Sequence, residues 1–310
     1  MLRIALSANA ENRVLDPKQP REEFSRWLFE PNNPLTARFI VNRIWQHHFQ
    51  RGLFENPSDV GVVSGGPTHP ELLDWLASEM QRRRWSMKEL HRQIVLSATY
   101  RQASMRHAAD QDWNLRLERD AGNRRYSRFP RYRLDGETLR DSMLSVAGLL
   151  EHRLGGAGAM PPLPPELTAT LPKDQWAPNS HEAEHFRRSV FVFARRNFRY
   201  PLFEVFDRPD AGGSCPQRDR STTASQALQM LNSELSLRCA QALRATWKAE
   251  FDLVDNRPLA IEQLWRRALG RRSTPHEQAL MAEFLSDSNA DSEIAACLAL
   301  LNSSEFLYVD

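Results

Sequence analysis

His181, Glu182 and His185 form the pattern H-E-x-x-H, within the segment HEAEH. On a helix, two histidines four residues apart can bind zinc while the glutamate activates a water molecule for hydrolysis. Pro178 precedes this pattern, Glu184 lies inside it and two arginines follow it, whereas metallohydrolase helices are apolar around the motif. We therefore favour a polar loop end without a metal, and keep a metal-dependent hydrolase of an extracellular polymer as the alternative.

A long polar segment, 195–223, carries the second set of candidate side chains, with Phe203 and Phe206 as apolar anchors. Loops of this length inside compact domains are usually functional or disordered, because their backbone groups need partners. The segment is either a binding surface or an Arg/Asp network that only stabilises the fold, and the sequence leaves both readings open. The candidate binding residues are Arg195, Arg196, Asn197, Asp207, Asp210, Cys215, Arg218 and Thr222.

Between Arg124 and Arg133, five arginines alternate with three aromatic residues. Such a mixture can stack bases and bind phosphates on a single-stranded nucleic acid. Alternatively, the aromatic rings pack inside the protein while the arginines pair with Glu137 and Asp141, one to two helical turns further on. We favour the structural alternative and rank nucleic-acid binding last.

The remaining reactive side chains give weaker signals. His47 and His48 point about 100° apart on a helix, which prevents both from binding one metal, so we expect packing and capping roles. Arg218 could lower the pKa of the Cys215 thiol, but no base for a nucleophile is identifiable. The sequence has no G-x-S-x-G, P-loop or G-x-G-x-x-G motif, which disfavours nucleotide-dependent chemistry, and we expect no cofactor.

Composition narrows the class of protein further. The 310 residues include 41 basic and 39 acidic side chains, so the net charge of +2 creates no general attraction to nucleic acid or lipid. No apolar run approaches the roughly 20 residues that span a bilayer. The apolar stretch within the first ten residues is too short for the hydrophobic core of a secretory signal, so we expect no secretory signal in this chain. Three well-separated cysteines allow at most one disulfide.

Helical patterns dominate the chain. After a predicted linker, a helix starts near Arg21, and a second runs from an Asn33 N-cap to Gly52. Capping boxes are predicted at Thr68/Glu71, Ser86/Glu89 and Thr274/Glu277. Residues 33–102 are predicted to form three antiparallel helices, and Asp135 caps a fourth that includes Leu150 and Leu154 and stops at Gly155-Gly156. Later helices are predicted from Thr223, from Pro258 to Gly270, from Thr274, and over about 291–302.

Two segments interrupt the helical series. Six prolines between Met160 and Pro178 preclude a helix across most of that stretch, which predicts an extended connector. Residues 189–194 (SVFVFA) form one clear strand-like run. The predicted fold is therefore all-α, with two helical lobes, a Pro-rich connector and at most a small β element. We expect a linker or remnant at 1–23 and a domain over 24–310, with lobes at about 24–155 and 186–310 joined by 156–185.

Several ordered blocks of the sequence resemble one known family. They are NPLTARFIVNRIWQHHFQRGLFENPSDVG, LHRQIVLSATYRQAS, RFPRYRLDGETLRDSMLSVAG, FDRPDAGGSCPQRDRSTTASQALQMLNS and LNSSEFLYVD. Over residues 24–310 the chain resembles the planctomycete surface domain family, a domain of unknown function. The resemblance implies a C-terminal module of large exported proteins, often downstream of a c-type cytochrome-like domain, located in the periplasm or at the cell surface. It supplies no catalytic residues.

Together, these observations predict a helical binding or assembly module of an exported, c-type-cytochrome-associated system. We expect a protein or glycan partner and no membrane span, and we favour a binding role over an enzymatic one.

Overall fold

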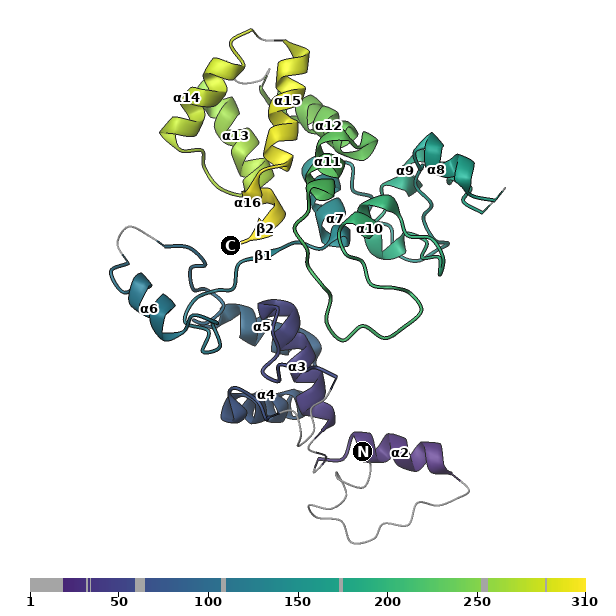
Figure 1. The fold of residues 1–310 in the computed structure, drawn as a ribbon, viewed down its shortest axis with the longest axis vertical. Helices are drawn as coiled ribbons and strands as arrows, with labels where there is room; N and C mark the ends of the chain where they lie inside the picture. Colours follow the sequence, from purple (N-terminus) through teal and green to yellow (C-terminus); the bar gives the residue numbers. More distant parts are fainter. Residues whose placement is uncertain are drawn as a thin grey trace. The chain divides into compact units, whose positions relative to one another are not determined.

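The computed structural model describes residues 19–31, 33, 35–58, 65–106, 110–172, 175–251, 256–287 and 289–310. Most of the predicted linker at 1–23 lies outside these residues. The described chain is mostly helical, as predicted (Figure 1). Its small β element consists of two paired two-residue strands, β1 (Tyr132–Arg133) and β2 (Tyr308–Val309).

The chain folds into two compact units: unit 1 contains residues 1–132 and Asp310, and unit 2 contains residues 133–309. The division follows Tyr132, whereas the sequence predicts lobes of 24–155 and 186–310 with a connector at 156–185. In the structure the Pro-rich stretch is part of unit 2, because its Leu163 and Trp176 lie in the same hydrophobic core as α7 and α12. The prolines also permit a short helix, α8 (Pro165–Thr170), that starts on Pro165.

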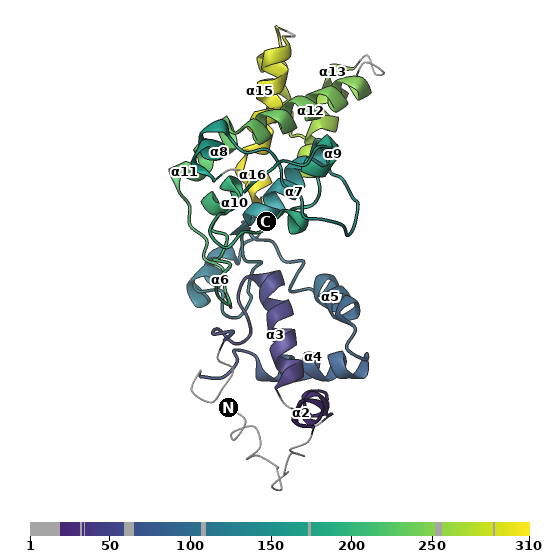
Figure 2. The same cartoon turned by 90° about the vertical axis from the view of Figure 1, so that its right-hand side faces the viewer.

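Unit 1 has a core formed by three helices. Its helices are α2 (Pro20–Leu28), α3 (Thr36–Phe49), α4 (Pro70–Arg82), α5 (Met87–Leu96) and α6 (Trp113–Arg119). α3 buries Val41, Ile44 and Phe49, and its partners bury apolar faces predicted from the sequence, such as Leu76 and Ile94. In both views α4 lies across α3 at a steep angle, so this pair does not have the predicted antiparallel arrangement (Figures 1 and 2).

The predicted start of α3 is close to the observed one, but its end has a different cause. The Asn33 side chain accepts hydrogen bonds from the backbone N–H groups of Leu35 (2.8 Å) and Thr36 (3.2 Å), so it caps the helix from three residues upstream. The terminating residue is Gln50, which is left-handed (φ 64°), and not Gly52. Gly52 is needed for space, because a Cβ there would lie 2.7 Å from the Asn42 side chain.

Two predicted capping boxes are absent although both helices form. The Thr68 hydroxyl donates to the carbonyl of Leu53 (3.3 Å) and does not cap α4. Ser86 is the N-cap residue of α5, but its side chain makes no capping bond. Glu89 instead pairs with Arg83 at 3.2 Å. In both cases a tertiary or neighbouring partner replaces the local bond that the pattern predicts.

Unit 2 surrounds a larger core. α7 (Gly136–Val146) and α12 (Glu234–Phe251) are packed against each other, and α12 also contacts α15 (Ala290–Leu301) and α13 (Arg257–Leu269). The remaining elements are α9 (Glu182–His185), the 3-10 turn η2 (Ser189–Phe191), α10 (Pro201–Val205), α11 (Ala224–Asn232), α14 (Pro275–Phe284) and α16 (Ser304–Leu307). No helix of the described residues combines the length and apolarity that crossing a bilayer requires.

α7 is shorter than predicted. Its N-cap is Asp135, as predicted, since the carboxylate accepts a hydrogen bond from the Thr138 backbone N–H at 2.8 Å. The helix ends at Val146, and Gly148 follows with φ 73°. A glycine in this left-handed conformation stops the helix well before Gly155-Gly156. Leu154 therefore lies outside the helix and is 77% exposed.

The strand predicted at 189–194 is wrong. Ser189–Phe191 form a 3-10 turn, and Val192 makes an isolated bridge with Ala159. The buried residues are Ser189 and Val192, three positions apart, while Val190 and Phe193 are exposed. This spacing fits a 3-10 turn and not the two-residue repeat of a strand.

The C-terminal helices follow the sequence prediction closely. α13 ends at Leu269 and is capped by the left-handed Gly270 (φ 71°), and α15 lies within a residue of its predicted limits. The Thr274/Glu277 capping box is confirmed: the Glu277 carboxylate accepts from the Thr274 N–H (2.7 Å), and the Thr274 hydroxyl accepts from the Glu277 N–H (3.3 Å).

Candidate functional site

A groove of about 820 Å³ follows the exposed side of α7 in unit 2. Its lining combines carboxylates, arginines, hydroxyls and a few apolar side chains. The charged members are Asp135, Glu137, Asp141, Arg188, Arg208, Arg218 and Glu305. Arg208 and Arg218 come from the polar segment 195–223 that the sequence singles out, so the structure brings part of that segment to a concave surface.

The segment that supplies these arginines is closed at its base by Asp207. The Asp207 carboxylate accepts hydrogen bonds from the Ser221 N–H and hydroxyl, both at 2.8 Å, and pairs with Arg133 at 2.8 Å. The Arg133 side chain is only 6% exposed and lies over the Phe206 ring. Residues 207 and 221 are thus joined at a neck, and the chain between them forms a loop on the surface of unit 2.

The loop contacts α7 through ion pairs with one carboxylate. Arg218 donates to both oxygens of Glu137, at 2.8 and 3.3 Å, and Arg208 lies 3.5 Å from the same group. Burial opposes the charge of Arg218, but the hydrogen bonds to Glu137 outweigh it and raise the pKa of the guanidinium. Asp141 accepts from the Ser189 N–H at 2.7 Å. Every charged group in this part of the groove therefore has a protein partner.

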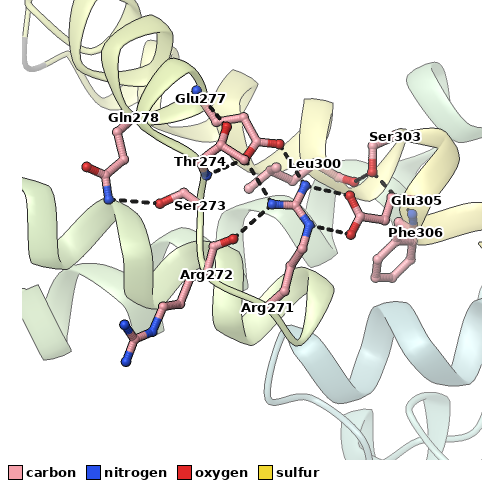
Figure 3. A network of polar contacts seen from close by, with 10 residues as sticks. All are labelled: Arg271, Arg272, Ser273, Thr274, Glu277, Gln278, Leu300, Ser303, Glu305 and Phe306. Carbon is pink, nitrogen blue, oxygen red and sulfur yellow. Dashed lines mark hydrogen bonds and ion pairs between the residues drawn. The ribbon is translucent and has the colours of Figure 1, made fainter. Parts of the chain in front are cut away.

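At the other side of the groove, Glu305 belongs to a network centred on Arg271 (Figure 3). Arg271 donates to both oxygens of Glu305 (2.6 and 2.7 Å) and of Glu277 (2.9 and 2.7 Å). The hydrogen bonds that Glu277 accepts, chiefly from Arg271 and also from Thr274, lower its pKa to about 2. The network fixes the loop between α13 and α14 to the start of α16.

The other residues predicted for binding lie outside the groove lining. Arg195 donates to the Gln175 carbonyl at 2.9 Å, whereas Arg196 and Asn197 are exposed in the adjoining turn. Asp210 accepts from the Gly212 N–H (3.2 Å) near the loop tip, and Thr222 is exposed at its end. The Cys215 thiol faces the Gln217 carbonyl at 3.0 Å. The predicted binding residues therefore do not form one site: Asp207 closes the base of the loop, Arg218 lines the groove, and the others lie outside the groove.

The HEAEH segment does not form a three-ligand cluster. A ring nitrogen of His185 lies 2.7 Å from the Asn179 carbonyl, Glu182 pairs with Arg238, and Glu184 pairs with Arg153. Within the described parts of the chain, no group of three or more histidine, cysteine, aspartate or glutamate side chains is placed to hold a metal ion.

Of the aromatic residues between Arg124 and Arg133, Tyr126 and Phe129 are buried and Tyr132 is half-buried, but the arginines have other partners than predicted. Glu137 and Asp141 bind side chains of unit 2, whereas Arg124 pairs with Glu55 (3.2 Å) and Arg131 with Asp310 (2.7 Å). Arg128 donates to the carbonyls of Asp120 and Ala121, both at 2.9 Å. Sequence proximity misled the prediction, because the partners of these three arginines all belong to unit 1, whereas Glu137 and Asp141 belong to unit 2.

Histidine and cysteine side chains give two further findings. A ring nitrogen of His48 lies 2.7 Å from one of His91, a contact that no short motif announces. Burial, and then the charges of His91 and His47, lower the pKa of His48. All three cysteines are free, and burial raises the pKa of Cys239 and Cys297 to about 12.

The sequence analysis also missed two buried arginines. Arg140 and Arg187 are fully buried in unit 2. Arg140 donates to the carbonyls of Arg187 (2.8 Å) and His185 (2.5 Å), and Arg187 donates to those of Ala157 (2.7 Å) and Gly155. Both hold irregular backbone in place. Arg140 occupies a position on the buried face of α7, with Leu139 and Met143, where an apolar residue would be expected, whereas no such pattern in the sequence marks Arg187.

Comparison with curated proteins and with solved structures finds no match. A family model matches residues 20–285, which include all of the described elements from α2 to α14. The chain therefore belongs to the PSD1 family, which is described as a protein of unknown function (DUF1553).

Proposed function

We propose that this chain is a helical binding or assembly module and that the groove along α7 is its contact surface. The observation that carries the proposal is the groove itself. Its volume of about 820 Å³ lies in the range of ligand sites, and its lining offers three arginines and four carboxylates beside hydroxyl groups. Such a lining suits a polar extended partner, either a peptide segment or a glycan.

The state of the carboxylates favours recognition over catalysis. Asp135 accepts from a backbone N–H at the start of α7, Asp141 accepts from the Ser189 N–H, and Glu137 and Glu305 are bound by arginines. A general acid or base must be within hydrogen-bond reach of the substrate group with which it exchanges a proton, whereas these carboxylates are already bound by groups of the protein. The groove therefore presents fixed charges, which complement a partner and orient it.

We also propose that the module serves an exported, c-type-cytochrome-associated system of planctomycetes, in the periplasm or at the cell surface. The support is the resemblance of the five sequence blocks together with membership of the PSD1 family. The partner in this proposal is a protein or glycan component of that system.

Filling the groove tests the proposal. Ser145 is exposed in the lining, so Ser145→Trp should block the groove without disturbing the core. Gln241→Trp is a matched control, because Gln241 is an exposed residue of α12 outside the lining. The probes are a purified c-type cytochrome domain and a set of neutral oligosaccharides, with affinity measured by thermophoresis.

We expect the wild-type chain to bind at least one probe, Ser145→Trp to lose that binding, and Gln241→Trp to keep it. Binding that survives the Ser145→Trp change would place the contact elsewhere. If the wild-type chain bound none of the probes, the proposal would be wrong in this form.

A further inference from the structure

A second polar concavity lies in unit 1, on the turn that follows α6, and it differs from the α7 groove in charge. Its volume is about 680 Å³. The described residues that line it are Thr68, His69, Arg119, Asp120, Ala121, Gly122, Arg124 and Arg125. We call it the arginine groove. We propose that it binds an acidic polysaccharide through the guanidinium groups of Arg119, Arg124 and Arg125.

The backbone of the arginine groove is fixed before any ligand arrives. Asp120 is 8% exposed, and its carboxylate accepts hydrogen bonds from the N–H groups of Arg124 (2.8 Å) and Arg125 (3.0 Å). In addition, Arg128 donates to the carbonyls of Asp120 and Ala121, and Arg51 donates to that of Gly122 (3.0 Å). Binding would therefore order side chains only, which lowers its entropic cost.

The charges of this turn are not balanced. Asp120 uses its two oxygens on backbone N–H groups and pairs with no guanidinium of the groove. Arg124 has a partner in Glu55 at 3.2 Å, where both side chains are more than half exposed. The exposed guanidiniums of Arg119 and Arg125 make no ion pair or hydrogen bond with any other residue that the structure describes. Several arginines in one concave surface form a ready site for oxyanions.

The surroundings decide which polyanion fits. Nucleic acids bind such surfaces by stacking bases on aromatic rings, but Tyr126 and Phe129 of the same segment are only 6% and 3% exposed. The His69 ring of the lining is itself packed against Tyr126, with ring centroids 5.7 Å apart, and lies 3.0 Å from the Thr68 hydroxyl. Tyr126 is also held in place, because Trp45 donates to its hydroxyl at 2.9 Å. Protein partners need apolar anchors, and Ala121 is the only apolar side chain among the described lining residues. A hydroxyl-rich chain carrying anionic groups requires neither feature.

The double variant Arg119→Ala/Arg125→Ala tests this inference, with a size-defined heparin octasaccharide as the probe. Arg196→Ala is the control for loss of an arginine outside the groove, because Arg196 is an exposed arginine of unit 2 without a described partner. Calorimetric titrations at several NaCl concentrations should show an affinity about ten-fold lower for the double variant and unchanged for the control. The salt dependence should also fall, by about one ion for each guanidinium removed.

Three results would overturn the inference. One is heparin binding that the double variant retains, with melting curves showing that the variant is folded. Another is an equal loss in Arg196→Ala, which would reveal attraction without a site. The third is binding of a single-stranded oligo(dT) of the same charge that is as tight as heparin binding, since the buried aromatic rings exclude base stacking. Failure of the α7 groove experiments would leave these measurements unaffected, because the probes and the variants are different.

Discussion

The arginine groove and the loop at residues 207–221 are built from the same residue types but expose opposite kinds of surface. Each is organised by one aspartate. Asp120 gives both of its oxygens to backbone N–H groups, so the neighbouring guanidiniums stay in solvent. Asp207 binds the guanidinium of Arg133 directly and closes the loop through Ser221.

A carboxylate that binds backbone N–H groups leaves nearby arginines exposed and able to bind a ligand. A carboxylate that binds a guanidinium pairs that arginine within the protein. Unit 1 also carries more basic than acidic side chains, and unit 2 the reverse. A single figure for the net charge of the chain conceals this division.

The largest effect is expected for Asp207→Ala. The change leaves the buried Arg133 guanidinium without its carboxylate and removes both bonds to Ser221. Breaking a buried ion pair by removing one partner is strongly destabilising, so we expect a loss of about 3 kcal/mol in the free energy of unfolding. Denaturant unfolding followed by circular dichroism measures it.

Two further substitutions serve as controls for this effect. Asp210→Ala alters an exposed carboxylate of the same loop and should change stability by less than about 0.5 kcal/mol. Asp207→Asn should lose less than Asp207→Ala, since asparagine tolerates the positive φ of 61° and keeps one acceptor. Equal stability of Asp207→Ala and wild type would show that the neck does not hold the loop.

Asp120→Ala should have a smaller effect on stability and a larger one on binding. The variant loses two acceptors of backbone hydrogen bonds, which corresponds to about 2 kcal/mol. It also frees the backbone that positions Arg124 and Arg125, so heparin affinity should fall although no arginine is removed. Glu118→Ala, an exposed change in α6, is the control. If Asp120→Ala lost stability but kept its heparin affinity, the turn held by Asp120 would not be what positions the arginines for binding.

Glu277 binds a backbone N–H, as Asp120 does, and also a guanidinium, as Asp207 does. It accepts hydrogen bonds from the Thr274 N–H and from Arg271 (Figure 3). These bonds lower its pKa from 4.5 to about 2 in the folded protein. The unfolded chain therefore takes up the proton first as pH falls. The stabilisation is complete above about pH 4.5 and is lost between there and about pH 2.

Glu277→Gln tests this dependence. Near pH 6 the variant should melt below the wild type, and the difference should shrink as the pH is lowered through this range. Melting temperatures between pH 6 and pH 2.5 measure it. A constant difference across that range would mean that the carboxylate charge is not the source of the stabilisation.

The helices were predictable from the sequence because their determinants are local. The Asp135 cap, the left-handed Gly270 and the Thr274/Glu277 capping box depend on residues within four positions of each other. The errors occur where a distant partner competes. Thr68 bonds Leu53 and does not cap a helix, and the run at 189–194 is shaped by Asp141 and by a bridge to Ala159.

The candidate sites were harder to predict than the helices, because their side chains are paired with residues far away in the sequence. The sequence marks segment 195–223 as polar and long, but it does not indicate that Arg218 meets Glu137, 81 positions away. Similarly, Arg124 to Arg133 is recognisable as basic and aromatic, and only the packing of Tyr126 against Trp45 separates its charges from its rings. Pairing over such separations depends on the fold as a whole.

The smallest effect on stability is expected for Arg218→Ala, although this side chain makes two bonds to Glu137. Arg218 is 40% exposed, so water screens the pair, and Arg208 remains 3.5 Å from the same carboxylate. Exposed ion pairs contribute about 0.2 to 1 kcal/mol, so we expect a loss in this range that shrinks further in 0.5 M NaCl. A loss above about 2 kcal/mol would mean that the groove arginines are structural, like Arg133. A small loss combined with reduced binding of a probe in the α7 groove would instead mean that an arginine already paired within the protein can be shared with a partner. The arginine groove and the loop at residues 207–221 would then both bind partners through arginines and would differ only in how strongly those arginines are paired within the protein.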